Sequence, residues 1–127
     1  MEYSINKKTD LSYKDTIDKI EEELKKEGFG ILNNTDVKKT LKDKINVNYS
    51  NYFILGVCNP KFAYKALENQ KDIGLFLPCN IVVYEDENKT IIKAINPEFS
   101  IGNLGNENLN QIAIEIKEKL KRVLNNI

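Results

Sequence analysis

Two stretches of the chain decide the fold, Ile54-Leu55-Gly56-Val57-Cys58-Asn59-Pro60 and Leu77-Pro78-Cys79-Asn80-Ile81-Val82-Val83-Tyr84. Each combines a short apolar strand with a Cys-Asn pair and a proline. In the first stretch, Asn59 is placed to cap a helix that begins at Pro60, where a missing N–H costs least. In the second, the proline and the Cys-Asn pair lead into the strand. We therefore expect both cysteines at strand ends, one of them beside a helix N-terminus.

The remaining elements follow from hydrophobic periodicity and from turn residues. Residues 2–8 alternate as a half-buried strand, and Gly28 is placed to end the first helix. Thr35 or Asp36 can cap the second helix. The acidic connector 85–89 predicts a hairpin between two apolar strands. The expected strands are 2–8, 29–32, 52–57, 81–84 and 90–95, and the expected helices are 12–27, one from 36 with the apolar stripe Val37, Leu41 and Ile45, one from 60, and 108–124.

This order predicts an α+β fold, β-α-β-α-β-α-β-β-α, in a single domain of residues 1–127. We expect a two-layer sandwich with a sheet of about five strands and helices mainly on one face. The hairpin is antiparallel, whereas the early β-α-β steps allow parallel neighbours, so the sheet is predicted to be mixed.

Composition excludes several classes of function. Lysine plus arginine (19) balances aspartate plus glutamate (19), so no strong net charge favours nucleic acid or an anionic membrane. No apolar run reaches transmembrane length. The chain begins without the apolar core of a signal peptide, and two cysteines are too few for a disulfide framework, so we expect a cytoplasmic protein.

Several short motifs resemble those of the DUF302 family, small proteins of unknown function. The two stretches quoted above carry the resemblance together, and the similarity extends over about residues 3–124. The other matching motifs are Gly28-Phe29-Gly30, Asp36-Val37, Ala63, Ala66-Leu67, Ile73-Gly74 and Asn96-Pro97.

The resemblance implies a compact α+β domain with helices packed largely on one side of a sheet, often found as a homodimer. It implies no established activity. Members of the family usually carry an acidic residue two positions before the aspartate that corresponds to Asp36, and here that position is Asn34. If that acid takes part in ligand or metal binding in the family, this chain has lost it or uses the neutral amide of Asn34 instead.

Few chemical groups remain as candidates for a site. Histidine is absent, which removes histidine-dependent nucleophilic and general base catalysis, and no phosphate-binding glycine motif or Cys-x-x-Cys is present. Cys58 beside a helix N-terminus is expected to have a lowered thiol pKa. The alternative is that Cys58 and Cys79 are small buried packing residues. Asp36 and Asn59 have structural explanations as helix caps, and Tyr49 and Tyr52 as packing or dimer contacts.

Two functions stay open on this reading. The first is a non-catalytic, dimeric module that binds a small ligand in a cleft near the cysteines, lined by Asp36, Cys58, Asn59, Cys79 and Asn80. The second is a thiol-dependent redox or sulfur-handling protein with Cys58 as the reactive group and Cys79 as its partner. We favour the binding module over an enzyme. The sequence specifies no cofactor and no metal site.

Overall fold

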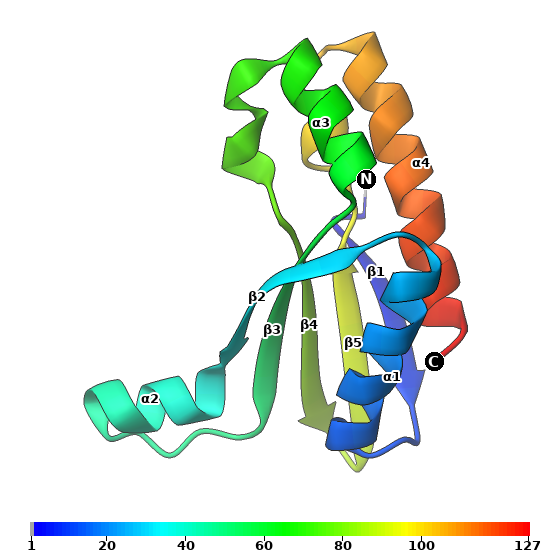
Figure 1. Ribbon diagram of the computed structural model, residues 1–127. Helices are drawn as coiled ribbons and strands as arrows, with labels where there is room; N and C mark the ends of the chain where they lie inside the picture. The colour runs from blue at the N-terminus through cyan, green and yellow to red at the C-terminus, as the bar shows by residue number, and fades with distance from the viewer. Residues whose placement is uncertain (1) are drawn as a thin grey trace.

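The structure is a computed structural model that describes residues 2–127. It follows the predicted order of elements, with two short 3-10 helices added (Figure 1). The strands are β1 (Ser4–Thr9), β2 (Gly30–Asp36), β3 (Tyr52–Cys58), β4 (Cys79–Asp86) and β5 (Lys89–Ile95), and the helices are α1 (Tyr13–Lys26), α2 (Val37–Ile45), α3 (Pro60–Asn69), η1 (Lys71–Phe76), η2 (Ile101–Asn103) and α4 (Glu107–Asn125).

The five strands form one sheet in the order β1-β5-β4-β3-β2, and every neighbouring pair is antiparallel. The α+β prediction is confirmed, but the expectation of a mixed sheet is wrong. The β1-α1-β2 step does join two strands that run in the same direction. Those strands lie at opposite edges of the sheet, because β5, β4 and β3 are inserted between them.

Strand β2 is longer than predicted. It continues through the polar residues Asn33, Asn34 and Thr35 to Asp36, because these residues pair with β3, with an irregularity in the register between Ile31 and Asn33. The predicted strand ended at Leu32, whereas the ladder with β3 extends it and satisfies the backbone groups of these polar residues.

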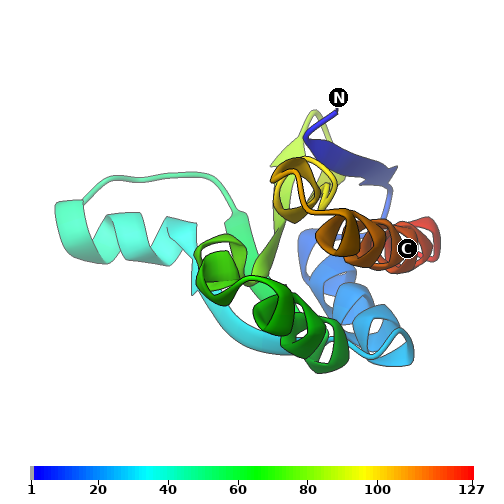
Figure 2. The ribbon, with the colours of Figure 1, turned by 90° about the horizontal axis from the view of Figure 1, so that it is seen from above.

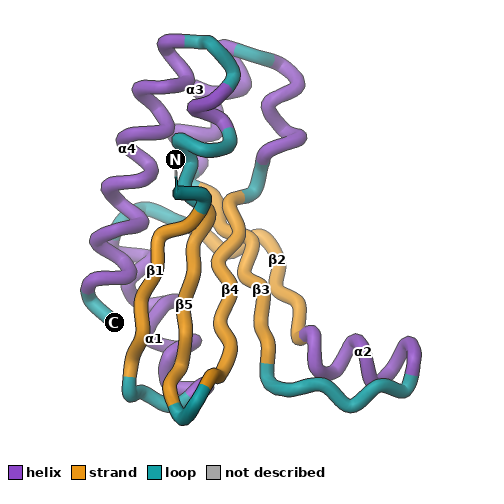
Figure 3. Tube along the Cα trace, turned by 180° about the vertical axis from the view of Figure 1, so that it is seen from behind, coloured by secondary structure: helices purple, strands orange, loops and turns teal. Residues whose placement is uncertain are grey.

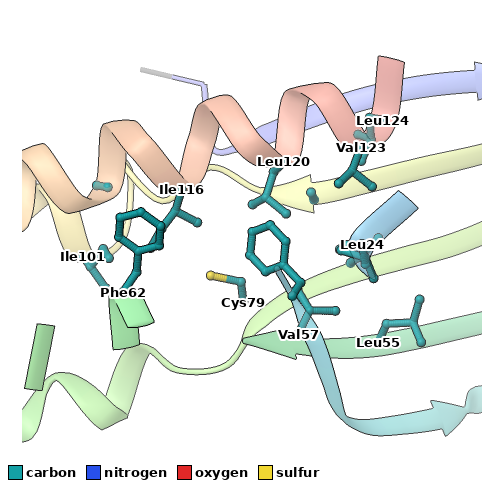
Figure 4. Packing of buried hydrophobic residues seen from close by; sticks show 14 of the residues in the cluster. Leu24, Leu55, Val57, Phe62, Cys79, Ile101, Ile116, Leu120, Val123 and Leu124 are labelled. Carbon is teal, nitrogen blue, oxygen red and sulfur yellow. The ribbon is translucent and has the colours of Figure 1, made fainter. Parts of the chain in front are cut away.

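Helices α1 and α4 cover one face of the sheet, and α3 packs beside α4 beyond the ends of β3 and β4 (Figures 1 and 3). Within residues 2–127, the opposite face, which we call the open face, carries no helix (Figures 2 and 3). Side chains alternate across a strand, so every second residue of β3, β4 and β5 points into the core beneath the helices. Figure 4 shows this core between strand and helix residues. Its fully buried members include Ile20, Leu24, Leu55, Val57, Ile81, Val83, Ile92, Leu109, Leu120 and Val123.

Side-chain caps begin three of the helices. Ser12 accepts a hydrogen bond from the Asp15 backbone N–H, Asp36 from that of Lys39 and Asn106 from that of Leu109. These contacts satisfy donors that the first turn leaves without an intrahelical partner. The starts of these three helices are thus set by residues within one turn of the chain.

Helix α2 departs from its predicted packing. It leaves the β2–β3 edge and projects away from the other three helices (Figures 1 and 2). Its apolar stripe is not covered: Val37 and Leu41 are half-buried, and Ile45 is 64% exposed. The prediction that this stripe faces inward is therefore wrong for the single chain.

Among residues 2–127, no helix is long and apolar enough to cross a bilayer.

Candidate functional site

The two cysteine-bearing strand ends come together, as the sequence predicts. Val57 pairs with Cys79 in the β3–β4 ladder, and Cys58 is the next residue along β3. Cys58, Asn59 and Cys79 all line one small cavity between the sheet and the helices, and its other walls are apolar residues such as Phe29, Phe62, Ile101 and Ile116. Figure 4 shows the Cys79 sulfur directed toward Phe62.

This cavity has almost no room. Its volume is about 10 Å³, near the lower limit for holding a single water molecule, and Cys79 is only 6% exposed. The side chains of α3 and α4 fill the space above the strand ends. The cysteine cavity is therefore closed to a small molecule in this conformation.

Burial also sets the protonation of the two thiols, which are both free. It raises the pKa of Cys58, and it raises the pKa of Cys79 to about 11, with a smaller contribution from the neighbouring Cys58 thiolate. An apolar environment disfavours the charged thiolate. The direction for Cys58 is opposite to the lowering expected from the helix N-terminus. Both thiols stay protonated at neutral pH, which disfavours nucleophilic chemistry.

Asn59 occupies the N-cap position of α3, but its side chain makes no cap hydrogen bond. Its Nδ2 instead donates to the Glu27 carbonyl oxygen at 3.1 Å, at the C-terminal end of α1. Gly28 follows with a φ of +83°, which supports its predicted role in ending α1. Asn59 therefore ties α1 to the start of α3. Its predicted N-cap position before Pro60 is confirmed, whereas the cap hydrogen bond from its side chain is not formed.

Asp36 lies far from the cysteines. It pairs with Phe53 at one end of the β2–β3 ladder, whereas Cys58 pairs with Gly30 at the other end. Five residues of extended strand separate these ends by roughly 17 Å. The Asp36 carboxylate caps α2. Burial raises the pKa of Tyr13 to about 12, and the negative charge of Asp36 makes a smaller contribution in the same direction. The structure thus separates Asp36 from the other four predicted site residues.

Asn80 is adjacent to Cys79 in sequence but lies on the opposite side of the sheet. Because successive strand residues alternate, Cys79 points into the core and Asn80 onto the open face, where it is exposed and pairs with Gly56. There it borders a hollow of about 450 Å³. The residues that line this hollow are Tyr3, Ser4, Tyr52, Asn80, Val82, Tyr84, Lys93, Ala94 and Ile95.

The walls of this hollow are aromatic with a few polar groups. Tyr52 and Tyr84 face each other across the β3–β4 ladder with their rings 5.4 Å apart and nearly parallel. Lys93 pairs with Val82 across the β4–β5 ladder. The ion pairs found within residues 2–127 do not include Lys93. Its ammonium group is therefore available to an anion.

Sequence reasoning missed the hollow as a candidate site. The signal was present as the alternation of Val82, Tyr84, Lys93 and Ile95 with core residues in β4 and β5. Alternation alone does not show which strands are neighbours, so it could not bring Tyr52 of β3 against Tyr84 of β4.

Gly56 lets two side chains approach the open face closely. A Cβ at this position would lie 2.5 Å from Asn33 Oδ1 and 2.9 Å from Pro78 Cγ. The glycine thus provides space for the proline that precedes β4 and for an asparagine of β2. In the described part of the chain, 2–127, no group of three or more acidic or cysteine side chains is placed to hold a metal ion.

The fold and the hollow define a small α+β domain with one helix-covered face and one open face on a five-stranded sheet. Within this class, the chain belongs to the DUF302 family. The family's sequence model, described as "Domain of unknown function DUF302", matches residues 5–127, which confirms the resemblance seen in the sequence motifs.

The chain is also similar to a solved structure, the crystal structure of the uncharacterized conserved protein DUF302 from Bacillus stearothermophilus. The two are 32% identical with a TM-score of 0.92, and the similarity covers 99% of this chain and 98% of that chain. No protein in the curated collection of characterised sequences matches the chain.

Proposed function

We propose that this protein is a non-catalytic, dimeric module that binds a small ligand in the hollow of the open face. The single observation that carries the proposal is that one hollow combines the stacked rings of Tyr52 and Tyr84 with the Lys93 side chain. The hollow beside Asn80 measures about 450 Å³, within the range of about 300–1,000 Å³ typical of ligand sites, whereas the cysteine cavity measures about 10 Å³.

The lining residues indicate the chemistry of the ligand. Stacked tyrosine rings offer flat apolar surface to a planar group, and Lys93 and Asn80 offer a positive charge and an amide beside it. These groups suit a small aromatic or unsaturated molecule with an anionic substituent. Of the predicted site residues, Asn80 is the one that this proposal places in contact with ligand.

The cysteine pair supports the binding function over the redox alternative. A redox role needs an accessible thiolate, and burial raises the pKa of both thiols. Two free cysteines also suit a reducing compartment, which supports the proposed cytoplasmic location.

The probe 1-anilinonaphthalene-8-sulfonate tests this proposal, because it is an aromatic anion with the chemistry that the hollow offers. We expect saturable binding, detected as increased probe fluorescence, and a loss of affinity of about tenfold in the variants Tyr84→Ala and Lys93→Met.

The matched controls change the same residue types elsewhere. Tyr64→Ala alters a tyrosine of α3 that is 65% exposed, and Lys25→Met alters an exposed lysine of α1. Both should bind the probe as the wild type does. Equal affinity in all four variants, or weakening by the controls alone, would refute the hollow as the ligand site.

A further inference from the structure

Residues 37–51 form an arm, which consists of α2 and the segment that returns to β3. The arm extends from the β2–β3 edge of the sheet, away from the layer of α1, α3 and α4 (Figures 2 and 3). Its apolar side chains are largely in solvent: Ile45, Val47 and Tyr49 are all exposed. The arm is thus an extended apolar surface that the described chain, residues 2–127, does not cover.

The sequence of α2 shows that this surface is built for packing. Val37, Leu41 and Ile45 recur every fourth residue and form one stripe along the helix. An isolated helix of nine residues is well below the roughly 12–15 residues at which helices become marginally stable in water. Its stability therefore calls for a partner surface against the stripe.

The open face is a second uncovered surface with matching character. Ile54 and Val82 lie side by side at the centre of the sheet, and the stacked Tyr52 and Tyr84 continue this apolar strip toward the end where α2 is attached. A sheet that packs on one face only presents the other to water or to a partner, and here that other face is largely apolar along its middle strands.

Charge complementarity between two parts of this chain indicates that the partner is a second copy of it. The arm is basic, with four lysines in α2, and the Lys39–Asp43 pair neutralises one of them. The end of β4 and the turn that follows are acidic and exposed, with Glu85, Asp86 and Glu87 in a row, and we call these three residues the acidic turn. Tyr52, where the arm ends, pairs with Tyr84, directly before this turn, so the basic arm and the acidic turn lie at the same end of the sheet.

Two copies can face each other through their open faces, related by a two-fold axis that runs parallel to the strands. This rotation keeps the arm and the acidic turn of both copies at the same end of the dimer, and it places the β2 edge of one copy opposite the β1 edge of the other. It therefore brings the arm of one copy toward the acidic turn of the other, and the reverse contact is identical by symmetry. The arm and the residues that line the hollow number about two dozen, within the roughly 20–30 that each partner contributes to a stable interface.

We propose that a second copy of this chain packs on the open face, with the arm of each copy lying over the sheet and the acidic turn of the other. The arm of the partner then closes the hollow, so the ligand site is complete only in the dimer. The statement about the closed hollow rests on the function proposed above, whereas the interface itself does not.

Sedimentation velocity of the full chain across micromolar concentrations tests the interface. We expect a dimer in the wild type, and Ile45→Asp to weaken dimerisation by about tenfold or more, because it places a charge in the apolar stripe. The matched control is Leu75→Asp on η1, which changes a leucine that is 82% exposed and far along the chain from the arm. It should leave the dimer intact.

Charge reversal tests the orientation of the two copies. Lys42→Glu and Glu87→Lys should each weaken the dimer, and the double variant should recover much of the loss, because the two charges attract again across the interface. Raised salt should reduce the effects of the single variants.

Three results would overturn the inference: a wild type that is monomeric, a dimer that Leu75→Asp dissociates and Ile45→Asp does not, or a double charge variant weaker than both single variants. A monomer that still binds the fluorescent probe would refute the interface and leave the ligand proposal standing. A dimer in which Tyr84→Ala and Lys93→Met leave probe binding unchanged would refute the ligand site and leave the proposed interface standing.

Discussion

Replacing Gly56 by alanine is the sharpest test of how the sheet is packed. The added methyl group would point onto the open face, 2.9 Å from the Pro78 ring and 2.5 Å from Asn33 Oδ1. The end of the asparagine side chain can move away, but the proline ring is held by the backbone on both sides. Overpacking of this kind costs about 1–3 kcal/mol of folding free energy.

The control is Gly30→Ala in the neighbouring strand β2. A Cβ at Gly30 meets nothing within 4 Å, and the residue lies in a strand, so alanine fits there without strain. It should change the free energy of unfolding by less than about 1 kcal/mol, mostly through the reduced entropy of the unfolded chain. The difference between the two variants therefore isolates the steric cost at Gly56.

Urea denaturation followed by far-ultraviolet circular dichroism measures both variants. With a urea dependence of about 1–3 kcal/mol per molar, Gly56→Ala should lower the midpoint by roughly 1 M. Adding Asn33→Ala removes the nearer contact and should recover part of the loss, while the contact with Pro78 remains. If Gly56→Ala is as stable as Gly30→Ala, the close approach of these segments on the open face is incorrect.

Two further predictions concern the residues around the cysteine cavity. Asn59→Ala removes the hydrogen bond to the Glu27 carbonyl and should destabilise the protein by about 1 kcal/mol in urea denaturation. The control Asn126→Ala loses one side-chain bond at the exposed end of α4 and should cost less, and equal losses would contradict the tie between α1 and α3. The pKa of Cys79 is about 11 in the folded state and near 9 in the unfolded state. Between these pH values, unfolding releases the thiol proton, so the free energy of unfolding falls as the pH rises. The total loss is at most about 3 kcal/mol. The fall should be shallower in Cys79→Ala, and identical pH profiles for the two proteins would show that the thiol is not buried as described.

The candidate site shows where local reasoning succeeded and where it did not. The pairing of β3 with β4 brings Cys58 and Cys79 together as predicted, because both end the strands that the apolar runs mark. The same alternation that buries Cys79 turns Asn80 to the other face, so two consecutive residues of the predicted site lie on opposite sides of the sheet. Because consecutive strand residues point to opposite faces, a shift of one residue determines whether a side chain is buried. Which face the helices cover is known only when the strands are assembled into the sheet.

The sequence by itself determined the order of the elements, the start of α3 at Pro60, and the apolar strands of the core. These features depend on residues a few positions apart, whose spacing can be read along the chain. Only the tertiary structure decided that β1 and β2 lie at opposite edges, that the helices fill the space above the cysteines, and that α2 projects without a covering surface. Those outcomes depend on contacts between segments distant in sequence, and the periodicity of one segment carries no information about which other segment packs against it.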